Sequence, residues 1–368
     1  MLDSMLTLRH PTGVTPVVVG PGALGACRAD LAPWLAGRTV FVLSTPRVLA
    51  LHGERLASLR GDAARWEVLE VEEGEAAKSV STAERLWDAM LAAGGKRDSR
   101  LLAFGGGSVG DLGGFVAGCF LRGIELTQIP TTLLAQVDAA IGGKTAVDLP
   151  GGKNTVGLFH HPAFVVSDTA VLPTLPREEL RSGLVEVVKM AALLDPGLLS
   201  AVEDGLEPLL AGDPAALGPV VAAAAAAKIG VVERDPDERG DRRLLNFGHT
   251  LGHAIESACG YGLPGSLRHG EAVAYGMLFV LRLALRRGLD PGLAERLSAL
   301  LRRFGLPVLP DSLDPRDLMH RMARDKKARE SGLVWVLPAA LGEGRMVTDV
   351  TPAEVEAELR GFLRQPFL

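Results

Sequence analysis

The chain has 368 residues, which is long for a single hydrophobic core, so two domains are expected. Its 47% apolar and 23% charged residues are typical of a soluble globular protein, and a net charge of −5 without a basic block argues against a nucleic-acid-binding face. Cys27, Cys119 and Cys259 are far apart and form no C-x-x-C pair, which argues against disulfides and thiolate-bound zinc and favours a reducing, cytoplasmic location. The N-terminal segment has no long apolar run, so no signal peptide is expected.

Short apolar or β-branched runs alternate with helical stretches through the first half of the chain. A helix is predicted over residues 82–95, where Gly94 and Gly95 provide the stop. The predicted strands end at Gly, Pro, Ser or Asp and cover residues 15–20, 38–44, 65–73, 99–107, 125–133 and 163–168. This alternation predicts a doubly wound, Rossmann-like α/β domain with a mainly parallel sheet over residues 1–176.

From about Glu178 onward the sequence is rich in Ala, Leu and Arg at helical spacing. The most apolar tract, residues 220–232, is interrupted by Lys228 and is expected to be a packed helix rather than a membrane span. Strand candidates return only at residues 332–342 and 345–350. A second, mainly α-helical domain is therefore expected over residues 177–368.

Lysine is rare in this chain, with 8 lysines against 31 arginines. Where arginine serves as nearly every surface cation, a retained lysine suggests a need for a compact ammonium group or a tunable pKa. Six lysines lie in or beside segments that other features mark as candidate functional sites: Lys144, Lys153, Lys189, Lys228, Lys326 and Lys327. The clustering favours a site for an anionic substrate, with chance and codon bias as the alternative.

Two polar turns follow predicted strands, at what should be one edge of the sheet. LLAFGGGSVGD leads from a strand into Gly105–Gly107 and Asp111, where a helix start would offer N–H groups and a positive dipole end to a phosphate. It is not a G-x-G-x-x-G motif, and a tight βα turn without a ligand is the alternative. EEGEAAK, residues 72–78, follows another strand, and doubly wound folds bind ligands beyond the carboxyl ends of their strands.

Residues 129–154 form a denser polar segment around two Gly-Gly steps. Lysine as a point charge and asparagine as an oriented donor suit phosphate or carboxylate oxygens. A solvated loop is the alternative interpretation. The polar residues of the segment are Thr131, Thr132, Asp138, Lys144, Lys153 and Asn154.

A histidine pair and a glutamate indicate a metal site in the second half. NFGHTLGHAIES places His249 and His253 on one helix face, about one turn apart, although the glutamate of an H-E-x-x-H motif is missing. His269 follows within about twenty residues, and RSGLVEVVKM puts Glu186 and Lys189 on one helix face, where a salt bridge is the alternative. A His/His/Glu set with one open position is typical of catalytic zinc. Together with a nucleotide-like turn, it suggests hydride transfer on a hydroxyl-bearing, anionic substrate.

These motifs, taken together, resemble those of the 3-dehydroquinate synthases. The resemblance covers about Glu73 to Lys327 and rests on GGGSVGDLGGFVAG, RGIELTQIPTTLLAQVDAAIGGKTAVD, GKNTVG, SGLVEVVK, RRLLNFGHTLGHAIE, HGEAVAYGM and DKK, in that family's order. It implies conversion of 3-deoxy-D-arabino-heptulosonate 7-phosphate to 3-dehydroquinate and phosphate, within the shikimate pathway of aromatic amino acid biosynthesis. The implied steps are transient NAD-dependent oxidation, phosphate elimination, reduction and intramolecular aldol closure.

The resemblance also implies cofactors, partners and domain roles. The cofactors are NAD⁺ and a divalent metal, Zn²⁺ or Co²⁺, and the substrate is an anionic sugar phosphate. The protein is implied to be a cytoplasmic homodimer with no nucleic-acid or membrane partner. Residues 1–176 become the NAD-binding domain, and residues 177–368 the metal- and substrate-binding domain.

The same resemblance assigns residues to each role. It makes Glu186, His249 and His269 the metal ligands, so that His253 lines the substrate site without binding metal. The implied NAD⁺ contacts are Glu73, Gly74, Glu75, Ala76, Ala77, Lys78, Gly107, Ser108, Val109, Gly110, Asp111, Thr131, Thr132, Lys144, Lys153, Val171, Leu172, Pro173 and Thr174. The implied substrate and catalytic residues are Asp138, Lys144, Asn154, Lys189, Lys228, Arg242, Asn246, His253 and one of Lys326 and Lys327. Arg122 is implied to reach the site of the neighbouring subunit.

Three positions depart from the family pattern. Ser44 ends a predicted strand where the family often has an aspartate for the adenosine ribose, which would weaken or redirect cofactor hydrogen bonds. Ala146 and Asp148 stand where Gly and Asn are common, and both replacements are expected to be tolerated.

Two related enzymes and one binding module remain as alternatives. A sugar-phosphate cyclase of secondary metabolism should lack cations fitted to the substrate carboxylate, whereas this chain has Arg242 and Lys228. A metal-dependent polyol dehydrogenase would accumulate NADH and has no need of so many lysines. A binding module with a structural metal would normally supply four protein ligands, and only three are in view.

Overall fold

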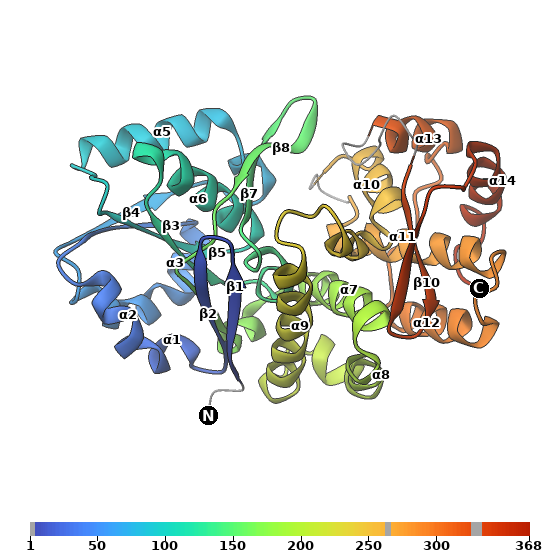
Figure 1. The fold of residues 1–368 in the computed structure, drawn as a ribbon, viewed down its shortest axis with the longest axis horizontal. Helices are drawn as coiled ribbons and strands as arrows, with labels where there is room; N and C mark the ends of the chain where they lie inside the picture. Colours follow the sequence, from blue (N-terminus) through green and yellow to red (C-terminus); the bar gives the residue numbers. More distant parts are fainter. Residues whose placement is uncertain (1–3, 262–265, 325–332) are drawn as a thin grey trace. The chain divides into compact units, whose positions relative to one another are not determined.

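The structure is a computed structural model that describes residues 4–261, 266–324 and 333–368 (Figure 1). The chain divides into two compact units. The first combines the residues up to Pro176 with Ala211–Asp237, and the second combines Arg177–Leu210 with Glu238–Leu368. The chain first leaves unit 1 after residue 176, where the sequence predicted a domain boundary. Residues 211–237, which were expected in the second domain, belong to the first unit.

Unit 1 is built on a seven-stranded sheet with the order β1-β2-β9-β6-β5-β3-β4. Strand β1 pairs antiparallel with β2, and all other neighbours are parallel. The strands are β1 (Ser4–His10), β2 (Gly13–Gly20), β3 (Thr39–Ser44), β4 (Arg65–Glu70), β5 (Arg100–Gly105), β6 (Glu125–Pro130) and β9 (Phe164–Asp168). Each of the six predicted runs overlaps one of these strands, so the predicted α/β fold is confirmed, and within this sheet only β1 was not anticipated.

Helices cover both faces of this sheet. Successive residues of a strand point to opposite faces, so a strand with consecutive apolar residues needs a packing partner on each face. Val40 and Val42 of β3 pack in one apolar core, whereas Phe41 and Leu43 pack in the other. The helices of unit 1 are α1 (Ala23–Ala26), α2 (Arg28–Leu35), α3 (Pro46–His52), α4 (Ala57–Arg60), α5 (Val80–Ala92), α6 (Gly107–Cys119) and α9 (Pro214–Arg234), and the short ones are η1 (Gly53–Leu56), η2 (Glu75–Ala77), η3 (Phe120–Arg122), η4 (Ala135–Ala139) and η5 (Thr169–Thr174).

Helix α9 lies against β1 and β2, and the backbone N–H of Arg9 donates a hydrogen bond to Glu233 at 2.7 Å. By length and composition α9 is also the one helix in the described part of the chain that could cross a membrane. Most of its apolar window, 61%, is buried inside the protein. This burial agrees with the prediction that residues 220–232 form a packed helix.

A β-hairpin begins within residues 129–154, the segment for which a solvated loop was the alternative interpretation. Strands β7 (Lys144–Leu149) and β8 (Gly152–Phe159) pair antiparallel, and η4, a short π-helix, precedes them. The solvated-loop alternative is therefore wrong for residues 144–149 and 152–154, which belong to paired strands.

Unit 2 is mainly helical, as expected, with one two-stranded antiparallel sheet. Its core surrounds α11, where the Phe279 ring lies 5.7 Å from that of Trp335 and 5.4 Å from that of Phe362. The elements are α7 (Arg177–Leu194), α8 (Pro196–Leu210), η6 (Asp241–Asn246), α10 (His249–Ala258), α11 (His269–Leu285), α12 (Pro291–Arg303), α13 (Pro315–Arg324), β10 (Trp335–Ala340), β11 (Glu343–Val347) and α14 (Pro352–Phe362).

Candidate active site

Four of the segments predicted to contact NAD⁺ lie at one edge of the seven-stranded sheet of unit 1. Residues 73–78 follow β4, residues 107–111 begin α6 after β5, Thr131 and Thr132 follow β6, and residues 171–174 follow β9. These strands are parallel, so their carboxyl ends share an edge, where doubly wound folds bind ligands. The structure therefore brings these four segments to the same side of the unit.

Lys78 connects three of the polar segments at this edge. Its Nζ lies 3.1 Å from Glu75 Oε1, 2.9 Å from Asp111 Oδ2 and 2.5 Å from Asn154 Oδ1. Burial opposes the charged ammonium, but the carboxylates of Asp111 and Glu75 outweigh it and raise the pKa of Lys78. Lys153 adds a second ammonium 3.6 Å from Glu75 Oε1. Lys78 is thus a charged, buried link between the turn after β4, the start of α6 and the β7–β8 hairpin.

The start of α6 can receive an anion. Its N-cap is Gly106, which has no side chain to bond the first N–H groups of the 13-residue helix. A Cβ at Gly106 would lie 3.0 Å from Thr132 Cγ2, so the turn after β6 approaches the same helix start. A phosphate at this point would meet backbone N–H groups and the Thr132 side chain.

The departures from the family pattern have clear local consequences. The Ser44 hydroxyl is fully buried and donates to the Phe104 carbonyl at 2.7 Å, so it offers no group to a ribose at the edge. Asp148 accepts the backbone N–H of Asn154 at 2.7 Å and so supports the left-handed conformation of that residue, with φ of 50°. Ala146 is buried within the hairpin.

Lys228 and Asp138, both predicted substrate residues, form an ion pair inside unit 1. Lys228 is 6% exposed, and its Nζ also donates to the Asp138 carbonyl at 2.6 Å. Helix α9 thereby contributes a buried ammonium to the first unit, although it lies far along the chain. Lys144, in contrast, is exposed at the start of β7.

His52 is a residue at this edge that the sequence did not single out. Thr174 gives its hydroxyl proton to the Val171 carbonyl at 2.7 Å, so the His52 Nε2, 3.0 Å from Thr174 Oγ1, must be the donor. His52 therefore steadies η5, which carries the last predicted NAD⁺ contacts. No motif surrounds it, and only the folded chain brings it to Thr174.

Arg122 lies at the opposite edge of the sheet from the predicted NAD⁺ segments that follow β4, β5, β6 and β9. It precedes β6, whose six residues span about 20 Å, whereas Thr131 follows that strand. Three consecutive residues have positive φ here: 49° at Leu121, 70° at Arg122 and 112° at Gly123. Such strain in non-glycine residues is uncommon and often accompanies a functional constraint.

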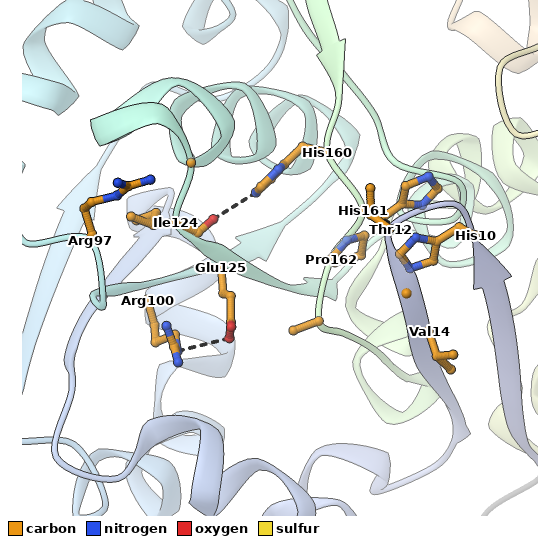
Figure 2. Close-up of a pocket in the computed structure, with 13 residues that line it drawn as sticks. His10, Thr12, Val14, Arg97, Arg100, Ile124, Glu125, His160, His161 and Pro162 are labelled. Carbon is orange, nitrogen blue, oxygen red and sulfur yellow. Dashed lines mark hydrogen bonds and ion pairs between the residues drawn. The ribbon is translucent and has the colours of Figure 1, made fainter.

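A depression of about 480 Å³ lies at this second edge, next to Gly123 (Figure 2). Figure 2 shows Arg100 paired with Glu125, and His160 bonded to the carbonyl of Ile124. Within the described residues, its lining includes none of the predicted catalytic, cofactor or metal residues. The candidate site is therefore defined by the side-chain clusters and not by this depression.

Unit 2 gathers the predicted metal residues from three helices. Glu186 on α7 is completely buried, and among the described residues its Oε1 accepts no hydrogen bond. Lys189, one turn further along, forms an ion pair with Glu186 Oε2, as the salt-bridge interpretation expected. Oε1 faces two imidazoles instead, with the Nε2 atoms of His249 and His269 at 3.8 and 3.7 Å.

The far side of each of these rings is bonded to an acceptor. His249 Nδ1 lies 3.1 Å from the Phe247 carbonyl, and His269 Nδ1 lies 3.0 Å from Glu256 Oε2. With Nδ1 as the donor in both contacts, the Nε2 of each neutral imidazole carries a lone pair, and both Nε2 atoms lie toward Glu186 Oε1. A buried carboxylate oxygen without a hydrogen bond and two such nitrogens fit a divalent cation.

His253 belongs to the same cluster and could complete a different ligand set. Its ring centroid lies 5.3 Å from that of His249 and 5.8 Å from that of His269, and the three histidines could together hold a metal ion. Both sets share His249 and His269. Glu186 Oε1 favours the set with the carboxylate, because it lies beside both Nε2 atoms and accepts no hydrogen bond among the described residues.

Tight helix packing brings these ligands together. A Cβ at Gly270 would lie 2.1 Å from the Ser182 carbonyl on α7, and the Gly270 N–H donates to Ser182 Oγ at 3.0 Å. A Cβ at Gly276 would lie 1.8 Å from the carbonyl of Gly248, just before α10. Helix α11 can therefore approach both α7 and α10 only because these positions lack side chains.

The remaining predicted residues of unit 2 lie near η6. Arg242 is 1% exposed, and Asn246 Nδ2 donates to Glu238 Oε1 at 3.2 Å. Glu238, which the sequence did not single out, has a positive φ of 57°. Lys326 and Lys327 lie outside the described residues.

The fold is that of known sugar-phosphate cyclases. A 2-deoxy-scyllo-inosose synthase complexed with carbaglucose-6-phosphate, NAD⁺ and Co²⁺ has a TM-score of 0.88 and 27% identity, over 97% of this chain and 99% of that one. A 2-epi-5-epi-valiolone synthase from Streptomyces hygroscopicus with NAD⁺ and Zn²⁺ bound has a TM-score of 0.86 and 32% identity, over 95% and 97%. An iron-containing alcohol dehydrogenase from Thermotoga maritima, with a TM-score of 0.69 and 16% identity over 95% and 98%, shares the fold alone.

The sequence comparisons are more specific. Residues 68–182 match the 3-dehydroquinate synthase N-terminal family model, and residues 183–328 match its C-terminal counterpart. The 3-dehydroquinate synthase of Xylella fastidiosa (strain M12) is 45% identical over 95% of this chain and 97% of its own length. That of Symbiobacterium thermophilum is 43% identical over 95% and 98%. The chain belongs to the 3-dehydroquinate synthase family.

Proposed function

We propose that the protein converts 3-deoxy-D-arabino-heptulosonate 7-phosphate to 3-dehydroquinate and phosphate, with NAD⁺ and Zn²⁺ or Co²⁺ as cofactors. Family membership over most of the chain supports the reaction. The observation that carries the metal assignment is the contact of one buried carboxylate oxygen, on Glu186, with the Nε2 atoms of His249 and His269. The cofactors found in the two related cyclase structures support the same choice.

In this proposal the cofactors supply the redox chemistry and the chain supplies position and charge. Bound NAD⁺ would accept and return a hydride, and a cation held by Glu186, His249 and His269 would polarise a substrate oxygen. The N-terminus of α6 and the segment around Lys78 would hold the cofactor phosphates. Lys78 is already charged and fixed at three contacts, so the cofactor edge needs little rearrangement on binding.

The substrate anion would be held by ammonium and guanidinium groups. Lys228 keeps Asp138 in place in unit 1, and the buried Arg242 supplies a guanidinium in unit 2. Lys144, Lys153 and Lys189 add charge that an uncharged polyol would not require. These groups stabilise a negatively charged transition state chiefly by being fixed in advance.

We also propose that the protein works as a cytoplasmic homodimer, with no nucleic-acid or membrane partner. Cys27, Cys119 and Cys259 are all free thiols, in keeping with a reducing compartment. The exposed, strained position of Arg122, at the far edge from its own chain's cofactor segments, supports a role toward a second copy.

One assay separates this function from its rivals. Purified protein is incubated with the heptulosonate phosphate, NAD⁺ and Zn²⁺, while phosphate release and NADH absorbance are followed together. Phosphate release without net NADH is expected. NADH in proportion to substrate would instead identify a dehydrogenase, and turnover of a heptulose 7-phosphate without the carboxylate would identify a sister cyclase.

A further inference from the structure

Glu256 stands out as a buried carboxylate with no role in the reaction outlined above. It lies on α10, two turns beyond His249, and is 5% exposed. Its Oε2 is 3.0 Å from Nδ1 of His269, the first residue of α11. A contact between residues on different helices cannot be read from the spacing of a motif.

The contact determines which nitrogen of His269 carries the proton. A carboxylate only accepts hydrogen bonds, so the Nδ1 of His269 donates to Glu256. The Nε2 lone pair is then turned toward Glu186 Oε1, 3.7 Å away. Had the proton been on Nε2, the ring would present a donor to the metal position instead of a ligand atom.

The two candidate imidazole ligands differ in what orients them. His249 donates to the neutral carbonyl of Phe247, whereas His269 donates to a carboxylate. An ionised acceptor forms a stronger hydrogen bond than a neutral one and increases the electron density on the opposite nitrogen. The orientation of the His269 ring and the electron density on its Nε2 should therefore depend on Glu256 more strongly than those of His249 depend on the Phe247 carbonyl.

We propose that Glu256 is a positioning residue that fixes the tautomer and orientation of His269 and thereby sets the affinity of the site for a divalent cation. The inference rests on the proposed function, because it takes Glu186, His249 and His269 as the ligands. The competing explanation is that Glu256 only ties α10 to α11. In that case its loss would change stability without changing metal affinity.

Glu358 provides a matched control for Glu256. It is also a buried carboxylate of unit 2, 6% exposed, and it forms ion pairs with Arg282 on α11 and with Arg286, the C-cap residue of that helix. It is not among the residues of the histidine cluster. Replacing Glu358 with Gln tests the effect of neutralising a buried, helix-linking carboxylate in the same unit.

The test measures metal affinity and folding separately. Wild type, Glu256→Gln, Glu256→Ala and Glu358→Gln are stripped with a chelator and titrated with Co²⁺, and the visible d–d absorption of the bound ion is recorded. Thermal unfolding of the metal-free proteins is measured in parallel. We expect Glu256→Ala to bind Co²⁺ roughly 10- to 100-fold more weakly, with an altered absorption spectrum. Glu256→Gln should lose less, since an amide oxygen can still accept the Nδ1 proton, and Glu358→Gln should bind as wild type does.

Two results would overturn the inference. The first is wild-type Co²⁺ affinity and spectrum in both Glu256 variants. The second is equal weakening in Glu256→Gln and Glu358→Gln, which would indicate a general loss of stability. If Glu256→Ala does not fold, the comparison of the two Gln variants still decides the matter. Wild-type protein that binds no Co²⁺ would refute the proposed metal site itself, and the inference with it.

Discussion

At the residue scale, the histidine cluster shows how three similar side chains can have different roles. His249 and His269 have Nε2 facing the buried Glu186 oxygen and Nδ1 bonded to an acceptor. The His253 ring packs against both of these rings. The spacing of His249 and His253 in the sequence therefore indicates a metal region without identifying its ligands.

The first prediction separates the two candidate ligand sets. His269→Ala is expected to abolish metal binding, because it removes a nitrogen shared by both sets. His253→Ala should retain it, because the Glu186, His249 and His269 set remains complete. Metal content after dialysis against limiting Zn²⁺ measures this for each variant. Loss of metal from both variants would favour the three-histidine set.

Sequence motifs located most candidate residues but missed those defined by tertiary contacts. Glu186, His249 and His269 lie in recognisable motifs, and the structure brings them together. Glu256 contacts His269 on another helix, and His52 contacts Thr174, far along the chain. Both contacts form only once the chain is folded. Glu238 is similar, since its positive φ cannot be inferred from its neighbours.

At the scale of elements, glycine positions control how closely the metal-bearing helices approach. Gly276 faces the carbonyl of Gly248 directly, and Gly270 faces that of Ser182. A helix interior normally disfavours glycine relative to alanine. Its presence in α11 is explained by the backbone contacts that no side chain would permit.

The second prediction follows from this packing. Gly276→Ala should destabilise the protein by about 1–3 kcal/mol, or more, because the new Cβ meets backbone that cannot rotate away. It should also weaken metal binding by displacing α10. Urea unfolding and Co²⁺ titration measure the two effects.

Gly205→Ala, on α8 of the same unit, is the matched control. Its Cβ would meet only Leu209 at 3.7 Å, an ordinary contact, so alanine should stabilise that helix by about 0.5–1 kcal/mol. Similar behaviour of the two variants would contradict the packing argument.

Element prediction succeeded where apolar runs are long and failed where they are short or exposed. Strands β3, β5 and β9 are largely apolar runs that are buried along almost their whole length, whereas the edge strand β4 mixes charged and apolar residues. Strand β1 buries only Leu8, so it lacks that signature. Strand β8 is largely exposed, and the dense glycines around the hairpin indicated a loop.

At the scale of the whole molecule, buried and partly buried histidines should make stability depend on pH. Burial lowers the pKa values of His10, His52 and His160, all in unit 1. The unfolded chain, with histidine pKa values of about 6.5, then binds these protons more readily than the folded protein does. Each group therefore reduces stability as the pH falls through about 6.5 toward its lower folded pKa.

The third prediction isolates one of these histidines. His160→Gln removes a titrating group whose pKa is lowered by burial, despite the opposing hydrogen bond to Ile124. The variant should lose less free energy of unfolding between pH 7.5 and 5.5 than wild type does. Urea unfolding at the two pH values measures the difference. Parallel pH dependences would show that His160 is not held neutral by the fold.

The fourth prediction tests whether Arg122 acts on a second subunit. Arg122→Ala and Lys189→Ala should each be inactive as homodimers. In a heterodimer of the two, one site would combine an intact Lys189 with the partner's intact arginine, so about half of the wild-type activity should return. Differently tagged chains allow this heterodimer to be purified and assayed. Heterodimers as inactive as their parents would rule out a role across subunits.

The return of α9 to the first unit limits how the gene can be divided. A product ending at residue 176 would leave uncovered the part of β1 and β2 against which α9 lies. The complementary product would contain a 21-residue apolar helix with no sheet to receive it. Split reporters, half-gene shuffling and circular permutation of this protein should therefore place their break points where residues 1–176 and 211–237 remain in the same polypeptide.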